Sequence, residues 1–219
     1  MMKNGFYCLA IMILLSSCSV IVKKIAHIKN PKVESSNTII NYLNKNNIPL
    51  ENNYLLKGNQ DSTTIYNNLL NGFKSEILIF DKKGIKYCYQ GTDKCTGKQL
   101  KQAYVNFQNS YKPCEKDSTL LNTILTNFQP LTEDSNLKVS DYYLIIYWNK
   151  YFGSKNKIGE DYTWLQTMKK DSDLDISILL VNTDLQTDWG LVEGKKMKIK
   201  FRLKSMKSAS IEFGKIPYK

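Results

Sequence analysis

Cysteine is the residue type with the richest chemistry in this chain, and there are five: Cys8, Cys18, Cys88, Cys95 and Cys114. Two fall in the first 18 residues and three in the body of the chain. Histidine occurs once, at position 27, so a Ser-His-Asp or Cys-His device would depend on that residue. The sequence has no Cys/His cluster with zinc spacing and no glycine-rich phosphate loop. We therefore predict no metal and no cofactor.

Cys18 ends a stretch that is typical of an export signal. Lys3 is followed by an apolar run from Phe6 to Leu15 and then by two serines. The run is too short for a membrane-spanning helix, which needs about 20 apolar residues. Leu15-Ser16-Ser17-Cys18 resembles the bacterial lipobox. That resemblance implies a signal peptide over 1–17 and lipidation of Cys18 at the start of the mature chain.

An uncleaved signal anchor is the alternative, because residues 5–22 carry no charge. The small and polar residues 16–19 in the middle of that stretch favour the lipobox. Several acyl chains together give a stable membrane anchor. Ser19 follows the cysteine where an aspartate would indicate retention in the inner membrane. We expect a lipid-anchored protein of the cell envelope. In an organism with an outer membrane, the protein should be anchored there and face the periplasm. Residues 18–36 should form the tether.

The chain carries a formal net charge of +11, which raises the question of nucleic acid or an anionic membrane as a partner of a functional basic face. Arg202 is the only arginine, whereas recognition of phosphates and base edges draws on the planar guanidinium. The lysines occur along the whole sequence. We predict that they reflect compositional bias and a solvated surface, and that nucleic acid is not a partner.

The first half of the chain alternates helical and strand patterns. Apolar spacing predicts helices at 38–44, from Asp61 or Ser62 to near Gly72, at 97–109 and at 118–128. Two apolar runs flank a turn that contains Gly84, which predicts a hairpin of strands at 76–80 and 85–89. In the tail, residues 196–203 and 208–213 are expected to form two antiparallel edge strands.

Residues 141–189 form the organising stretch. Residues 142–148 are a near-continuous apolar run, as in a strand buried on both faces, and 175–182 resemble them. A helix over about 160–170 lies between, so the two strands should be parallel neighbours with a right-handed crossover. We expect one α/β domain over 37–219, with its core at about 141–214.

The stretch resembles the thioredoxin-like superfamily. Ile146-Tyr147-Trp148 matches the apolar strand that ends in aromatic-Trp, and Val181-Asn182-Thr183-Asp184 is similar to the Val-Asn-x-Asp that closes the next strand. The resemblance covers about 50 residues. It implies an α/β fold with a thioredoxin-like mixed sheet flanked by helices.

The positions of the family's two active-site cysteines have lost their thiols. When the strand ends are matched, Phe152 stands for the nucleophile and Lys155 for the resolving cysteine. Thiol-disulfide exchange needs a thiolate, which neither side chain can supply. The family's cis-proline is also missing, because residues 189–200 contain no proline. The resemblance therefore implies the fold without the redox activity or a glutathione site.

Three cysteines remain for the body of an exported chain, where thiols tend to oxidise. Cys88 and Cys95 flank a turn that contains Gly91, so we predict a disulfide between them, with Cys114 free or paired with one of them. Three cysteines allow three different single disulfides, and the sequence alone does not indicate which of them forms. A pair joining 88 and 114 could also be redox-active.

Two functions follow from these residues. The first is a redox-inactive thioredoxin-like binding or scaffolding module, held at the envelope by its lipid, with an unidentified protein partner. Aromatic residues near the lost active-site loop would form its contact surface: Trp148, Tyr151, Phe152, Tyr162 and Trp164. The alternative is a thiol-disulfide oxidoreductase that uses Cys88, Cys95 or Cys114.

Asp171-x-Asp173-x-Asp175 is similar to a calcium loop but lacks its glycine and glutamate, so we predict a polar connector there.

Overall fold

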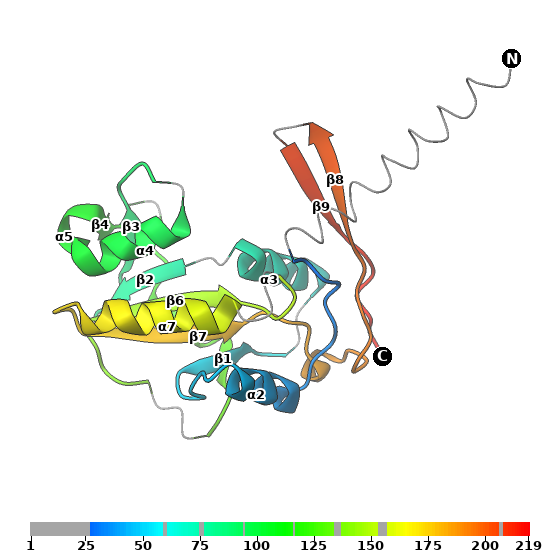
Figure 1. The fold of residues 1–219 in the computed structure, drawn as a ribbon. Helices are drawn as coiled ribbons and strands as arrows, with labels where there is room; N and C mark the ends of the chain where they lie inside the picture. The colour runs from blue at the N-terminus through cyan, green and yellow to red at the C-terminus, as the bar shows by residue number, and fades with distance from the viewer. Residues whose placement is uncertain are drawn as a thin grey trace, which may run out of the picture.

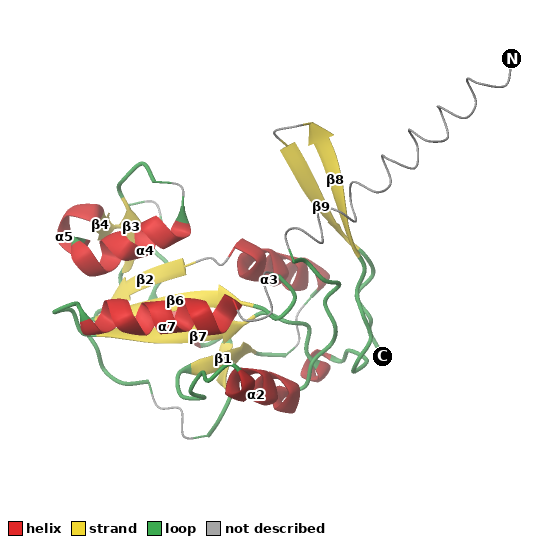
Figure 2. Cartoon of the chain, viewed as in Figure 1, coloured by secondary structure: helices red, strands yellow, loops and turns green. Residues whose placement is uncertain are grey.

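The protein is an α/β fold built on one seven-stranded mixed sheet with helices on both faces (Figures 1 and 2). The computed structural model describes residues 27–58, 61–74, 77–93, 95–115, 117–133, 137–152, 157–205 and 208–219. The strand order in the sheet is β4-β3-β2-β6-β7-β1-β5. The predicted class, a mixed sheet flanked by helices, is confirmed.

Two parallel strands form the centre of the sheet. β6 (Tyr142–Trp148) pairs with β7 (Ile176–Asn182) in continuous register from Tyr142 opposite Ile176 to Trp148 opposite Asn182. Every residue of β7, and every residue of β6 after Tyr142, is buried. Helix α7 (Lys157–Lys170) connects them and lies in front of the sheet in Figure 2. The predicted strand-helix-strand unit is therefore confirmed.

Antiparallel strands extend the sheet beyond β6. β2 (Ile77–Asp81) pairs with β6, and β3 (Lys86–Tyr89) pairs with β2 as the predicted hairpin. β4 (Tyr111–Pro113), a strand that we did not expect, forms the edge beside β3. On the other side, β1 (Asn53–Leu56) runs parallel to β7, and β5 (Phe128–Pro130) pairs with β1 in the antiparallel sense.

Each face of the sheet has its own apolar cluster. One cluster joins the sheet to α2 (Ser36–Lys45), α4 (Thr96–Val105), α5 (Phe107–Ser110) and α7. The other joins it to α3 (Ser62–Lys74), α6 (Leu121–Leu125) and buried residues between Leu185 and Ile216. Because strand side chains alternate between faces, β6 and β7 supply both clusters.

Two of the predicted helices differ from the structure. The helix expected at 97–109 is divided at Asn106 into α4 and α5. The helix expected at 118–128 is wrong beyond the short α6, because Phe128 begins β5. Phe128 pairs with Leu56 in the ladder, and its ring packs 6.0 Å from the ring of Tyr54. Pairing with the open edge of β1 thus outweighs the local helical pattern.

The tail forms a sheet of its own. β8 (Ile199–Ser205) and β9 (Ser208–Phe213) are antiparallel, as predicted, but they pair only with each other and do not form an edge of the main sheet. In Figure 1 this hairpin projects from the end of the molecule opposite α4. At its base, the ring of Phe213 stacks 5.5 Å from the ring of Tyr66 of α3.

The predicted tether extends too far along the chain. Ile28, Val33 and Glu34 are buried, and the backbone N–H of Glu34 donates to the carbonyl of Leu185 at 2.7 Å. Residues 28–35 therefore belong to the folded body. Cys18, the signal peptide and the rest of the tether lie outside the described residues. Within the described ranges, no helix is both long and apolar enough to span a bilayer.

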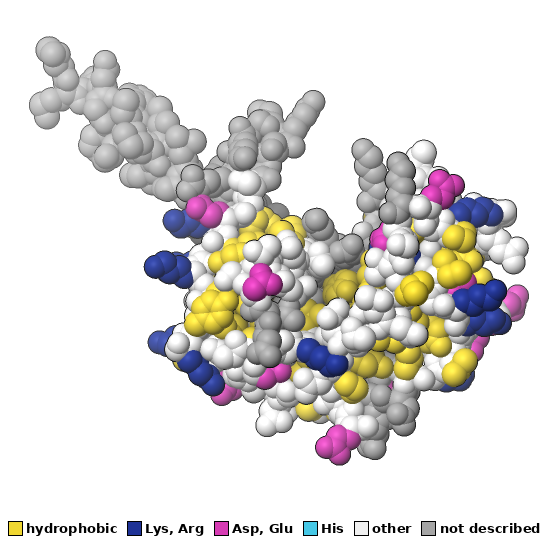
Figure 3. Space-filling model, turned by 180° about the vertical axis from the view of Figure 1, so that it is seen from behind, with side chains coloured by type: hydrophobic (Ala, Val, Ile, Leu, Met, Phe, Trp, Pro, Cys, Tyr) yellow, Lys and Arg dark blue, Asp and Glu magenta, His cyan; other side chains and the backbone are white. Residues whose placement is uncertain are grey.

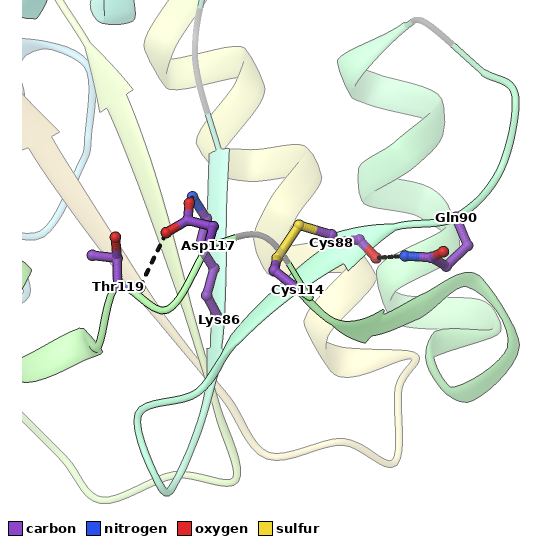
Figure 4. The surroundings of a disulfide bond; sticks show 6 residues. All are labelled: Lys86, Cys88, Gln90, Cys114, Asp117 and Thr119. Carbon is purple, nitrogen blue, oxygen red and sulfur yellow. Dashed lines mark hydrogen bonds and ion pairs between the residues drawn. A yellow bond between two sulfur atoms is a disulfide. The ribbon is translucent and has the colours of Figure 1, made fainter.

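The disulfide joins Cys88 to Cys114, not to Cys95, so the predicted pairing of Cys88 with Cys95 is wrong (Figure 4). Cys88 lies in β3, and the backbone N–H of Cys114 continues the β3–β4 ladder by donating to the carbonyl of Lys86 at 2.9 Å. The strand register brings the two α-carbons to 5.1 Å, within the usual range for a disulfide. Cys95 is free and exposed.

Replacing both Cys88 and Cys114 by Ser should lower the free energy of unfolding by about 3 kcal/mol, because the bridge closes a loop with a sequence separation of 26 residues. Urea unfolding measures the change. Cys95→Ser is the matched control, since it removes an exposed thiol without opening a cross-link. Equal losses in the two variants would contradict a stabilising role for this bridge.

Candidate functional site

The candidate site lies where β6 and β7 end. Parallel neighbours end at the same edge of a sheet, and ligands of open α/β sheets bind there. Here the loop 149–152 meets the turn 183–186, and the backbone N–H of Thr183 donates to the carbonyl of Trp148 at 2.9 Å. Segment 27–35, α3 and α7 approach the same edge.

A buried ion pair closes one side of this edge. The Lys150 ammonium lies 2.7 Å from Oε2 of Glu34, and the two side chains are 15% and 3% exposed. Tyr151 donates its hydroxyl hydrogen to Oε1 of the same carboxylate. Glu34 comes from segment 27–35, so the pair binds the N-terminal segment to the end of β6. Lys150 also lies 5.4 Å from the centre of the Tyr42 ring.

Burial and hydrogen bonding around this ion pair shift the pKa values of Glu34 and Tyr151 in opposite directions. Burial opposes ionisation of Glu34, but hydrogen bonds from Lys150, Thr38 and Tyr151 outweigh that penalty and lower its pKa. Burial and the bond to Glu34 raise the pKa of Tyr151. Glu34 is therefore a carboxylate and Tyr151 a neutral phenol at neutral pH.

Asp184 is a second carboxyl group at this edge and is fully buried. Its oxygens accept hydrogen bonds from the backbone N–H of Lys150, at 3.2 Å, and from Nδ2 of Asn182, at 2.9 Å. Burial raises its pKa to about 7, against the lowering effect of Asn182 and Lys150. Asp184 thus joins the ends of both central strands and changes ionisation near neutral pH.

Asn149 shapes the loop that follows β6. Its Oδ1 accepts the backbone N–H groups of Tyr151, at 3.2 Å, and of Phe152, at 2.9 Å. Gly72 of α3 packs directly against this loop. A β-carbon at position 72 would lie 2.0 Å from Oγ1 of Thr183 and 2.6 Å from Nδ2 of Asn149, so only glycine allows the approach.

Three side-chain donors at this edge have no partner among the described residues: Nε1 of Trp148, Nδ2 of Asn149 and Nε2 of Gln186, all on residues more than nine-tenths buried. Trp148 and Asn149 line a cavity of about 40 Å³, whose walls include Phe152, Ile158 and Leu165. An unpartnered buried donor is costly, so this cavity is suited to a water molecule or to an acceptor atom of a ligand.

An apolar groove of about 260 Å³ continues from the cavity between α4 and α7. Ile146, Asp161 and Leu165 line both hollows. The start of α4, at Thr96 and Gly97, forms one wall. Trp164, which is 37% exposed, stands on the α7 side.

The predicted aromatic surface is only partly open. Trp148 is buried, its ring stacked 5.8 Å from that of Tyr42. Tyr151, Phe152 and Tyr162 are half-buried, and Trp164 is exposed. Phe152 packs edge-on against Phe73 at 5.2 Å. Lys155, which the thioredoxin-like resemblance matches to the second cysteine position, lies outside the described residues.

The free thiol and the disulfide lie on opposite faces of the β3 hairpin. Tyr87 and Tyr89 pack into the cluster that contains α4, and strand side chains alternate, so Cys88 points to the other face. Cys95 immediately precedes α4, and backbone N–H groups of Lys98 and Gly97 lower the pKa of its thiol. The structure brings Cys88 and Cys114 together and leaves Cys95 apart.

Glu34, Lys150 and Asn149 did not emerge from the sequence, and Trp148 was named there as an aromatic contact, not as a hydrogen-bond donor. Glu34 and Lys150 are 116 residues apart, and no local pattern links them. Asp184 belongs to the Val-Asn-x-Asp run, which could have drawn attention to it. Across the described ranges, no group of three or more His, Cys, Asp or Glu side chains could hold a metal ion.

Comparisons with known protein families, with curated proteins and with solved structures found no match to this chain.

Lys150→Met should lower the free energy of unfolding by about 3–5 kcal/mol, because it leaves the Glu34 carboxylate buried without its cation. Thermal or urea unfolding measures the loss. Lys82→Met is the matched control, since its pair with Asp141 has side chains 63% and 55% exposed, and it should change stability by less than about 1 kcal/mol.

Adding Glu34→Gln to the Lys150→Met variant should recover part of the loss, because the buried charge disappears. If the single variant were as stable as the Lys82→Met control, the ion pair would not be a buried structural contact.

Proposed function

We propose that this chain is an exported lipoprotein, anchored to the outer membrane through Cys18 and facing the periplasm, whose redox-inactive thioredoxin-like domain binds a polypeptide partner. The anchor rests on the lipobox Leu15-Ser16-Ser17-Cys18. The binding role rests on the groove between α4 and α7 and on the unpartnered donors of Trp148 and Asn149, which line the adjoining cavity.

The strand neighbours support a thioredoxin-like arrangement. In that superfamily a strand-helix-strand unit is followed by an antiparallel hairpin and a closing helix. Here β6, α7 and β7 form the unit, and β2, β3 and α4 have the form of the hairpin and helix, with β2 beside β6. They come earlier in the chain than in the superfamily, so we propose the same neighbours in a rearranged order.

The absence of redox chemistry follows from what occupies the matching positions. Phe152 stands for the nucleophile and packs on Phe73, and a phenyl ring cannot form a thiolate. Cys88, in β3, is joined to Cys114, which directly follows β4, away from the ends of β6 and β7.

The unpartnered donors carry the binding proposal. Trp148 and Asn149 each carry a buried, unpartnered N–H and both line the cavity, and the adjoining groove is apolar with one exposed indole, that of Trp164. A polypeptide supplies both complements, because its backbone carbonyls accept hydrogen bonds and its apolar side chains fill grooves. Aromatic anchors such as Trp contribute strongly at such contacts.

Thiol-disulfide exchange remains the second candidate, favoured by the lowered pKa and exposure of Cys95. Exchange would need Cys95 to attack the Cys88–Cys114 bond across the hairpin. Thiol titration with and without a dithiol reductant separates the two functions. Reversible cycling of that bond in the wild type, lost in Cys95→Ser, would support the oxidoreductase over the binding module.

Cys18→Ser should move the protein from the membrane fraction of cells to the soluble fraction, because the residue that would carry the acyl chains is gone. Fractionation followed by immunoblotting measures the shift. Cys8→Ser is the matched control, since that cysteine falls within the proposed signal peptide, and it should leave the protein on the membrane. Full retention of Cys18→Ser would contradict lipidation at this position.

A photo-crosslinking residue in place of Trp164 should capture a discrete partner in living cells, because this side chain borders the groove. The same probe at Val139, which is 80% exposed and does not line the groove, is the control. Adding Trp148→Phe, which removes the buried donor with little change of shape, should reduce capture at 164. Equal capture at 164 and 139 would contradict a docking role for the groove.

A further inference from the structure

The net positive charge of this protein is concentrated near its two ends. Residues 195–219 contain nine basic residues and one acidic residue, Glu212. Residues 35–194, which include all seven strands of the main sheet, contain seventeen basic and eighteen acidic residues and are close to neutral. Lysines occur along the whole sequence, but acidic residues balance them only over 35–194.

The fold brings the two basic ends together. Segment 27–35 runs beside the chain that enters β8: the backbone N–H of Val33 donates to the carbonyl of Lys195 at 2.9 Å, and that of Met197 to the carbonyl of Pro31 at 2.8 Å. Lys32 and Lys196 form an antiparallel bridge. Lys29 therefore joins the lysines of the tail at one end of the molecule.

We use the name basic end for the exposed lysines Lys29, Lys195, Lys196, Lys198, Lys200, Lys215 and Lys219. The ion pairs found between described residues involve none of them. Glu193 and Glu212 are the exposed acidic residues nearest to them in the chain, and Glu212 lies opposite Lys200 in the β8–β9 ladder. Most of this charge is therefore uncompensated. In Figure 3, lysine side chains follow the left edge of the molecule, the side of the C-terminus.

The composition of the basic end favours lipid over nucleic acid. All seven residues are lysines, and Arg202 is the one arginine among the nine basic residues of 195–219. Lysines act as compact point charges, whereas recognition of nucleic acid draws on the arginine fork. A lysine near a membrane that contains anionic lipid gains about 1 kcal/mol, roughly a fivefold increase in partitioning. Several such lysines on one end suit an extended anionic surface better than a single small anion.

The position of the basic end fits the same partner. Cys18 is nine residues before His27, a span of at most about 30 Å for an extended chain. If Cys18 is lipidated, the basic end follows closely after the anchor. The β8–β9 hairpin projects from the end of the molecule opposite α4, so contact there leaves the α4–α7 groove open (Figure 1).

We propose that the basic end docks on anionic phospholipid headgroups and orients the domain on the membrane. This inference rests on the proposed membrane anchoring and adds a second, electrostatic contact to it. The lipid chains would supply the attachment, and the lysines would select an anionic surface and fix which end of the domain faces it. Salt weakens such a contact, because exposed charges are screened.

The test is co-sedimentation of the full chain with vesicles of phosphatidylcholine alone or mixed with phosphatidylglycerol. The test variant carries Lys195→Gln, Lys196→Gln, Lys198→Gln and Lys200→Gln. The matched control replaces four exposed lysines elsewhere, Lys45, Lys83, Lys101 and Lys170, by Gln, so that both variants lose the same net charge. The lipid concentration is set where the neutral vesicles bind part of the wild-type chain.

Phosphatidylglycerol should increase binding of the wild type and of the control by roughly tenfold or more, and this increase should be lost in the test variant. All three should bind the neutral vesicles equally, because that arm reports the N-terminal anchor alone. An unchanged increase in the test variant, an equal loss in the control, or tighter binding of the wild type to duplex DNA at the same phosphate concentration would each overturn the inference.

Failure of electrostatic docking is distinguishable from failure of the lipid anchor. A chain without lipidation would lose membrane association in the neutral arm or in cells, while its response to phosphatidylglycerol would still depend on the four lysines. A lipidated chain without electrostatic docking would bind both kinds of vesicle equally.

Discussion

Parallel pairing of β6 with β7 is the interaction on which the rest of this structure depends. It runs over the full length of both strands, and nearly all of their side chains are buried. Full burial of a Leu or Ile contributes about 1.5–3 kcal/mol, and these strands supply such residues to the clusters on both faces. Every other strand of the sheet is placed by pairing outward from this centre. A polar substitution at Ile145 or Leu179 would therefore disturb the cluster that joins the sheet to α3 and α6.

The same pairing creates the polar edge. Because the strands are parallel and in register, the loop after Trp148 and the turn after Asn182 emerge side by side, and Asp184 can accept the backbone N–H of Lys150. Little water reaches this edge, so each charge there needs a partner. Lys150, in the loop after β6, is the cation that pairs with the carboxylate of Glu34, and Glu34 belongs to segment 27–35 outside the sheet. The ion pair is best understood as a constraint that selects one position for the N-terminal segment, since buried pairs add specificity more reliably than stability.

The central unit was predictable because its signals are local: an apolar run, a helical pattern and a second apolar run. The parts that escaped prediction depend on contacts far apart in the chain. Phe128 fits a helix by its spacing, yet the open edge of β1 recruits it into a strand. Cys95 is closer to Cys88 in sequence, but the pairing of β3 with β4, which no turn signal predicts, puts Lys112 opposite Cys88 and brings Cys114, two residues further on, within bonding reach of Cys88. For the candidate site, the sequence indicated the loop after β6, which contains no cysteine. It could not indicate Glu34, whose partner is 116 residues away.

The buried ion pair also decides how the protein carries mechanical load. A force applied before residue 27 reaches the body through segment 27–35. There it is opposed by the Glu34–Lys150 pair, by the bond from Glu34 to Leu185, and by the backbone bonds to residues 195 and 197. Lys150 and Leu185 follow the two central strands directly, so tension passes to the most deeply packed part of the sheet. A domain held in this way can be pulled by its N-terminus without first peeling away an edge strand.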